Sequence, residues 1–216
     1  MPIIAATGFV LTASGSDAFW DVAAKVLSQY PSLDAQGIMT YSFVVHNFSG
    51  EFGITQPIDG VVGSFIMPVL HPENTSVSLT AALYKTFSQA TAWNPQFLYG
   101  ATPTVYPDFW AWYSINNGPL DAGYDQYLGS RLLDEQALTG NLTALAAAYK
   151  TATPSGGMTS AYLVGGHGVM NAKPRGGSNA VNSAWRKAYV HAGVLSSIKS
   201  KTLTDLNSAR CSVETI

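Results

Sequence analysis

A double glycine followed by a histidine is the part of this sequence where residue type and spacing first suggest chemistry. Gly165 and Gly166 end the apolar run that starts at Met158, and His167 follows them directly. Glycines let a backbone come close to a flat partner, although a bulge or bend in a strand needs the same residues. His167 could donate to a substrate carbonyl, carry a proton, or be a structural hydrogen-bond partner.

Other common chemistries lack their residues in this sequence. The run GGHG at 165–168 is not the GxGxxG pattern of dinucleotide sites, and neither a P-loop nor a GxSxG elbow occurs. The four histidines are scattered without close carboxylate pairing, which predicts no metal site. Cys211 is the only cysteine, so an intrachain disulfide and a thiolate metal cage are excluded.

The composition is poor in charge. Charged residues make up 11% of the 216 residues, well below the roughly 25% of an average soluble domain. We therefore expect another domain or subunit to cover part of the surface. The net charge of −2 and the isoelectric point near 6.0 argue against a general nucleic-acid binder. We expect neither a membrane span nor a signal peptide, and the compartment stays unknown.

Apolar periodicity predicts the elements that position these residues. We expect strands over 3–12, 37–47, 61–70, 96–105, 128–133, 158–170 and 189–196, and helices over 17–30, 74–91, 109–114 and 134–150. Pro31 should end the first helix, Asn74 should cap the second, and Gly140 should interrupt the last. The core-facing side chains expected on the second helix are Val77, Ala81, Tyr84, and Phe87 or Ser88.

Strands in pairs with helices between them predict the fold class. This order favours an α+β fold, an antiparallel β-sheet with helices packed on one face. We expect a single domain over residues 1–192. Apolar density falls after that point, so residues 193–216 are expected to form a divergent, partly disordered tail.

Four sequence blocks occur in an informative order. They are DAFWD at 17–21, TVYPDF at 104–109, GSRLL at 129–133 and AVNSAWRKA at 180–188. Together they resemble the substrate domain of fungal FAD-linked oxidoreductases of the berberine-bridge-enzyme type, in the vanillyl-alcohol-oxidase fold group. The resemblance covers about residues 1 to 192.

The resemblance implies a protein of two parts. In that family one domain binds FAD, and the second lays an antiparallel sheet over the flavin ring with the substrate between them. This sequence resembles the second part only, so we expect a truncated fold that does not bind FAD alone. The expected partners are a small-molecule substrate and either a separate flavin-binding domain or another copy of the chain.

The resemblance also implies two catalytic residues and a flavin contact. Tyr162 stands three residues before the double glycine, where plant members carry a glutamate base. A tyrosine base needs a pKa lowered from about 10 by a neighbouring donor or charge. His167 would be the second catalytic residue, and Gly165 and Gly166 would lie against the flavin.

Aromatic residues are the candidates for substrate binding. Tyr41 and Phe43 alternate on one strand, and Trp110 belongs to an aromatic helix. Each could line a pocket for a planar substrate or pack into the core. Trp185 and Arg186 are interpreted as a structural corner, with the guanidinium on backbone carbonyls.

Three functions remain open. The first is the substrate domain of an FAD-linked oxidoreductase in fungal secondary metabolism, such as alkaloid or polyketide biosynthesis. It would oxidise an alcohol, amine or activated C–H group by hydride transfer to flavin. The second is a cofactor-free pericyclase or binding scaffold descended from that family. The third is an inactive truncated product.

Overall fold

The computed structural model describes residues 1–50, 55–117, 126–177 and 180–197. The strands are β1 (Ile3–Ala13), β2 (Met39–Phe48), β3 (Ile58–Pro68), β4 (Leu98–Tyr106), β5 (Gln126–Asp134), β6 (Gly157–Leu163) and β7 (Ala188–Ser197). The helices are α1 (Ala18–Ser28), α2 (Tyr30–Ala35), α3 (Ser76–Thr91), α4 (Phe109–Asn116), α5 (Glu135–Thr139), α6 (Leu142–Ala152) and α7 (His167–Met170), with a 3-10 turn η1 over Ser183–Arg186. None of the described helices is both long and apolar enough to cross a membrane.

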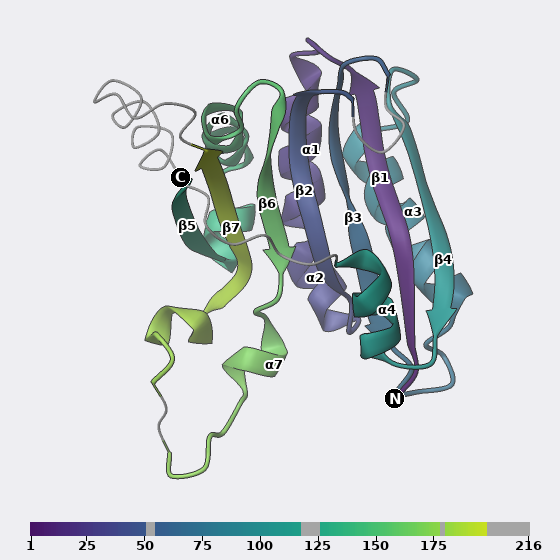
Figure 1. Cartoon of the computed structure of the whole chain (residues 1–216), viewed down its shortest axis with the longest axis vertical. Helices are drawn as coiled ribbons and strands as arrows, with labels where there is room; N and C mark the ends of the chain where they lie inside the picture. Colours follow the sequence, from purple (N-terminus) through teal and green to yellow (C-terminus); the bar gives the residue numbers. More distant parts are fainter. Residues whose placement is uncertain (51–54, 118–125, 178–179, 198–216) are drawn as a thin grey trace.

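The strands of the described residues form one sheet in the order β4-β1-β3-β2-β6-β7-β5. All neighbouring pairs in this sheet are antiparallel. The predicted α+β class, an antiparallel sheet with helices packed on it, is confirmed (Figure 1). The last strand, β7, lies between β6 and β5, and β5 has its only described strand neighbour in β7.

Most helices cover one face of the sheet. Alternate strand residues point towards that face, and the core contains Ile4, Ala6 and Val10 of β1 together with the inner side chains of α1, α3 and α6. In α1 the side chains of Phe19, Ala23, Val26 and Leu27 are buried. Figure 1 shows α1, α2 and α3 behind the sheet and α4 in front of it.

The second face of the sheet is covered only in part. There Trp112 of α4 packs with Ile3, Ala5 and Ile66 in a small separate cluster. The expectation that all helices pack on one face therefore needs one correction, because α4 caps the opposite face at one end. The rest of that face carries half-exposed side chains.

Two helix predictions were wrong in detail. Pro31 does not end helical structure, because it occupies the first turn of α2, where a proline needs no hydrogen-bond donor. Helix α3 begins after Thr75 rather than Asn74, since the Thr75 side chain accepts from the Ser78 backbone N–H. Its buried face carries Leu79, Leu83 and Phe87, whereas Val77, Ala81 and Tyr84 are exposed.

The apolar run after Met158 is not one continuous strand. Strand β6 ends at Leu163, a turn at Gly165 and Gly166 follows, and His167 begins the short helix α7. Gly166 has a φ of +80°, a left-handed value that ends an extended strand. The predicted break at Gly140 is confirmed, with Asn141 as the cap of α6.

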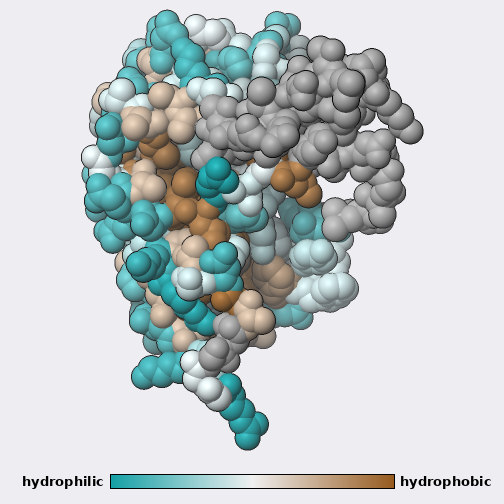
Figure 2. All heavy atoms as spheres, turned by 90° about the vertical axis from the view of Figure 1, so that its left-hand side faces the viewer, coloured by the Kyte–Doolittle hydropathy of each residue, from teal (hydrophilic) through white to brown (hydrophobic). Residues whose placement is uncertain are grey.

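The expected domain boundary at residue 192 falls within β7, which continues to Ser197. The predicted tail from 198 onward lies outside the described residues. Figure 2 shows the side of the molecule that carries β5, where apolar residues are visible among polar ones. This agrees with the low share of charged residues in the chain.

Candidate functional site

Strands β2 and β6 bring three aromatic side chains together on the face that most helices leave uncovered. The register that pairs Thr40 with Leu163 and Phe43 with Ser160 sets Tyr41 opposite Tyr162. The ring of Tyr162 contacts Tyr41 at 5.4 Å and Phe43 at 5.4 Å between ring centroids, both edge-on. All three side chains are half-buried. We call Tyr41, Phe43 and Tyr162 the aromatic face.

A tryptophan of α4 closes one end of the aromatic face. Trp112 stacks on Tyr41 at 5.5 Å with 19° between the rings, and its Nε1–H donates to Ser64 Oγ at 3.0 Å. Trp110, the tryptophan predicted from the sequence, is 70% exposed and stacks on Tyr113 instead. The structure thus brings Tyr41 and Phe43 to Tyr162 but not Trp110, whose substrate contact stays a prediction.

His191 is a neighbour of the aromatic face that sequence reasoning missed. It pairs directly with Tyr162 between β6 and β7, so the two side chains lie on the same face of the sheet. The indole of Trp185 contacts the His191 ring at 5.6 Å between centroids. A register prediction for the last strand pair would have found His191, but sequence alone does not fix that register.

The environment of Tyr162 opposes a role as a base. Burial raises the pKa of the Tyr162 hydroxyl, and the neighbouring Tyr41 raises it further. A base would need the pKa to be lowered, as noted from the sequence. Tyr162 is therefore a neutral hydroxyl at physiological pH, able to donate a hydrogen bond to a bound ligand.

The double glycine comes close to the protein's own backbone and side chains. Gly165 and Gly166 donate their N–H groups to the carbonyls of Tyr189 and Ala188 at 3.0 and 2.8 Å. A Cβ at Gly165 would lie 2.2 Å from the Ala188 oxygen, and one at Gly166 would lie 2.1 Å from Asp34 Oδ1. Glycine is required here because of these contacts within the chain.

His167 is held by a carboxylate rather than placed on the aromatic face. Its backbone N–H donates to Asp34 Oδ2 at 2.9 Å, and its Nδ1 is in a short hydrogen bond with the same oxygen. Its ring contact is with Tyr189, at 5.9 Å between centroids. The described contacts do not join His167 to Tyr162, so a shared catalytic role for these two residues stays a prediction.

These residues fit FAD only in part. The aromatic face is half-exposed, so its rings are available to contact one side of a ring system. The start of α7 is not a free anion site, because the His167 backbone N–H donates to the Asp34 carboxylate. An anion at this point would be repelled by Asp34, so the part of FAD that these residues fit is the ring. No cluster of three potential metal ligands occurs among the described residues.

A second polar cluster lies at the end of the sheet. The Asp59 carboxylate, 1% exposed, is hydrogen-bonded to His46 Nδ1 at 2.8 Å and accepts the Asn47 backbone N–H at 2.8 Å. It also accepts from the Ser14 hydroxyl and the Gly15 N–H, at 3.3 and 3.0 Å. This buried carboxylate ties the ends of β1, β2 and β3 together, and nothing in the sequence pattern singled it out.

Comparison with known proteins agrees with this architecture. No known family model matches the sequence, and no curated protein matches it. The solved VAO-type flavoprotein MtVAO713 from Myceliophthora thermophila C1 is similar with a TM-score of 0.78 at 19% identity, over 98% of this chain and 37% of that chain. The chain has the fold of a part of this flavoprotein.

Two further solved structures are similar. The VAO-type flavoprotein MtVAO615 from the same organism, solved at pH 5.0, has a TM-score of 0.67 at 14% identity, over 96% of this chain and 35% of that chain. Glycopeptide hexose oxidase DBV29 complexed with teicoplanin has a TM-score of 0.53 at 12% identity, over 99% of this chain and 40% of that chain. The chain thus spans 35–40% of the length of these proteins, and the likeness establishes a shared fold.

Proposed function

We propose that this chain is the substrate-binding domain of an FAD-linked oxidoreductase of the vanillyl-alcohol-oxidase group, of the berberine-bridge type. One observation carries the proposal. Tyr162 stands between Tyr41 and Phe43 on a sheet face that is half-exposed, while the opposite face is packed with helices. An uncovered aromatic sheet face is a surface for a flat ligand, not a core.

The chain's share in the reaction is to bind and orient the substrate. The rings of Tyr41 and Phe43 would contact a planar or ring-shaped group, and the Tyr162 hydroxyl would donate to an oxygen or nitrogen of the substrate. When bound, FAD would supply the acceptor for a hydride from an alcohol, amine or activated C–H group. Its nucleotide part would be held by a separate domain or a second chain, as the family resemblance implies.

The resemblance of the four sequence blocks extends the proposal to fungal secondary metabolism, with an alkaloid or polyketide as substrate. The flavoprotein MtVAO713 supports the fold on which this rests. The substrate class itself rests on the sequence blocks at 17–21, 104–109, 129–133 and 180–188.

A second candidate function is a cofactor-free scaffold or pericyclase that holds an apolar ligand on the same face. Two observations favour it. The double glycine, expected to lie against a flavin, is packed against Ala188 and Asp34. Tyr162 is also kept protonated, since its raised pKa disfavours proton abstraction.

Binding of two flavins to the purified chain tests the first proposal. Riboflavin carries the ring without the diphosphate, whereas FAD carries both. Without its flavin-binding partner the chain should hold neither flavin tightly: we expect dissociation constants of about 1 mM or weaker, equal within about threefold, because only the ring would meet the chain. The measurement is flavin fluorescence during titration with protein.

The variants Phe43→Ala and Tyr162→Ala should weaken riboflavin binding at least fivefold. Tyr84→Ala is the matched control, since Tyr84 is 44% exposed on α3, away from the aromatic face. Absence of riboflavin binding, or equal loss in the Tyr84 variant, would overturn the proposal. Turnover of a polyene without any flavin, lost in Tyr162→Ala, would instead support the scaffold.

A further inference from the structure

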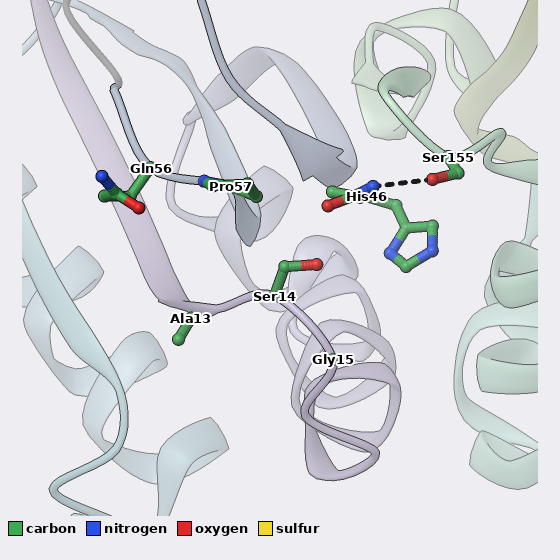
Figure 3. Close-up of a pocket in the computed structure, with 8 residues that line it drawn as sticks. Ala13, Ser14, Gly15, His46, Gln56, Pro57 and Ser155 are labelled. Carbon is green, nitrogen blue, oxygen red and sulfur yellow. Dashed lines mark hydrogen bonds between the residues drawn. The ribbon is translucent and has the colours of Figure 1, made fainter.

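We propose that His46, oriented by Asp59, and the pocket beside it bind a neutral hydroxyl-bearing ligand such as a sugar or polyol (Figure 3). This site is separate from the aromatic face. His46 belongs to β2 but points to the helix side, where its ring contacts Trp20 of α1, whereas Phe43 of the same strand points to the other side. The inference does not depend on the proposed function.

Asp59 fixes the tautomer of His46. A carboxylate is only an acceptor, and Asp59 Oδ1 already takes the N–H of Asn47, so the proton in the 2.8 Å contact belongs to His46 Nδ1. In this tautomer the lone pair lies on Nε2. Within the described part of the chain no hydrogen-bond partner of Nε2 occurs, although the His46 side chain is 28% exposed.

The ring is also held in place. The Trp20 indole lies 5.2 Å from the His46 ring between centroids, at 60°. With one edge bonded to a buried carboxylate and one side against an indole, His46 cannot turn freely. An oriented acceptor of this kind binds a ligand O–H group at a small entropic cost.

The pocket beside His46 combines apolar surface with several hydroxyl and amide groups. It is open to solvent, with a volume of about 710 Å³, which is in the range of small-molecule sites. Its lining residues are Ala13, Ser14, Gly15, His46, Asn47, Gln56, Pro57 and Ser155. Figure 3 shows Ser14 between Pro57 and His46, with Ser155 on the same side of the pocket as His46.

The chemistry of the lining selects the ligand class. Apart from the imidazole, no lining side chain carries a charge, so the site offers nothing to balance an anion or a cation. The hydroxyl of Ser155 and the amide of Gln56 can donate and accept, while the Ser14 hydroxyl, whose proton goes to Asp59, can accept; the hydroxyls of a carbohydrate match both roles. Asn47 Nδ2 donates to Ser155 Oγ at 2.9 Å, which orients that hydroxyl.

The test uses D-glucose as the probe and inorganic phosphate as the charged control. Histidine side chains labelled with 15N and 13C are observed by NMR during titration of the whole chain. We expect the His46 nitrogen signals to show a protonated Nδ1 and an unprotonated Nε2. Glucose should shift them in a saturable way, with a dissociation constant of about 1 mM or weaker for so small a ligand. His71, which is exposed elsewhere, should not shift.

Variants separate binding from a purely structural role. In ligand-observed saturation transfer, His46→Gln should lower the glucose signal at least fivefold, while His71→Gln should leave it unchanged. Both variants must keep the melting temperature within a few degrees, and Gln56→Ala provides a second test that leaves the Asp59 bonds intact.

Two results would overturn the proposal. One is the absence of any glucose-induced shift of the His46 signals at glucose concentrations up to about 100 times the expected dissociation constant. The other is an equal glucose signal in wild type, His46→Gln and Gln56→Ala. A phosphate shift at His46 larger than the glucose shift would also contradict it, because it would show an anion site.

Discussion

The ring of Trp112 stacks on the ring of Tyr41, with centroids 5.5 Å apart, and its indole N–H donates to Ser64 Oγ at 3.0 Å. One side chain of α4 thereby joins β2 and β3 on the face that the other helices leave uncovered. Trp112 is 3% exposed, whereas Trp110, two residues earlier, is 70% exposed.

This contrast predicts different costs for two tryptophan substitutions. Trp112→Ala should lower the free energy of unfolding by about 3–5 kcal/mol, because it removes a buried ring and a hydrogen bond. Trp110→Ala should change it by less than about 0.5 kcal/mol. Urea unfolding followed by circular dichroism measures both. Equal losses in the two variants would show that α4 does not pack as described.

The turn after β6 predicts a second matched pair. Gly166 and Gly176 both have left-handed φ values, +80° and +85°, but only Gly166 has a neighbour within 4 Å, the Asp34 carboxylate. Gly176→Ala should lower the free energy of unfolding by about 1 kcal/mol through backbone strain alone. Gly166→Ala should cost about 3 kcal/mol or more, since its Cβ would also displace Asp34. The free energies of unfolding of the two variants provide the comparison, and similar values would argue against the close approach at Gly166.

Two buried tyrosines predict opposite responses to loss of a hydroxyl. Tyr30 shares a 2.7 Å hydrogen bond with Ser42 Oγ, whereas the Tyr149 hydroxyl has no partner among the described residues. Tyr30→Phe should destabilise by about 1 kcal/mol. Tyr149→Phe should be neutral or stabilising, because it removes a buried polar group that lacks a hydrogen bond. A loss of more than about 1 kcal/mol in Tyr149→Phe would reveal a hydrogen bond to its hydroxyl.

The same tyrosines predict a loss of stability in alkali. Burial raises the pKa of Tyr30 and Tyr149 far above 10, and that of Tyr162 in the same direction. The folded state therefore holds these protons at a pH where the unfolded chain has released them. The protonated tyrosines make their full contribution to the free energy of unfolding below about pH 10. That contribution is lost as pH rises from there towards the pKa values of the folded state.

Urea unfolding between pH 8 and 11 measures this loss. Above about pH 10 the free energy of unfolding should fall less in Tyr149→Phe than in wild type, because the variant lacks one of the protons that the folded state retains. Tyr84→Phe is the control, since Tyr84 is exposed. An unchanged pH profile in Tyr149→Phe would contradict the assignment.

The strands and the sheet class were predictable because the apolar alternation is local. The periods at Ile3–Ala13 and Met39–Phe48 follow directly from neighbouring residues. The buried face of α3 was predicted wrongly, because Val77 and Leu79 are both apolar. Only the packing of the helix on β1 and β4 selects Leu79. Local propensity cannot make that choice.

The candidate site was predictable in part. Alternation placed Tyr41 and Phe43 on one side of a strand, and the structure adds Tyr162 to them. The role of Arg186 was also predicted correctly, since its Nη1 donates to the Val169 carbonyl at 2.6 Å.

The bond between His167 and Asp34 could not be foreseen, because it joins residues that are distant in sequence. The same holds for the pairing of His191 with Tyr162, which depends on the register of the last strand. Long-range register and tertiary contacts are not encoded in any local pattern.

The position of β7 has a consequence for synthesis of the protein. On the ribosome β5 emerges well before β7, at Ala188–Ser197, yet β7 is its only described strand partner. A nascent chain therefore leaves the strand-pairing groups of β5, its backbone N–H and C=O groups, without this partner until β7 has been synthesised. The residues of β7 thus decide when β5, although made earlier, can join the sheet.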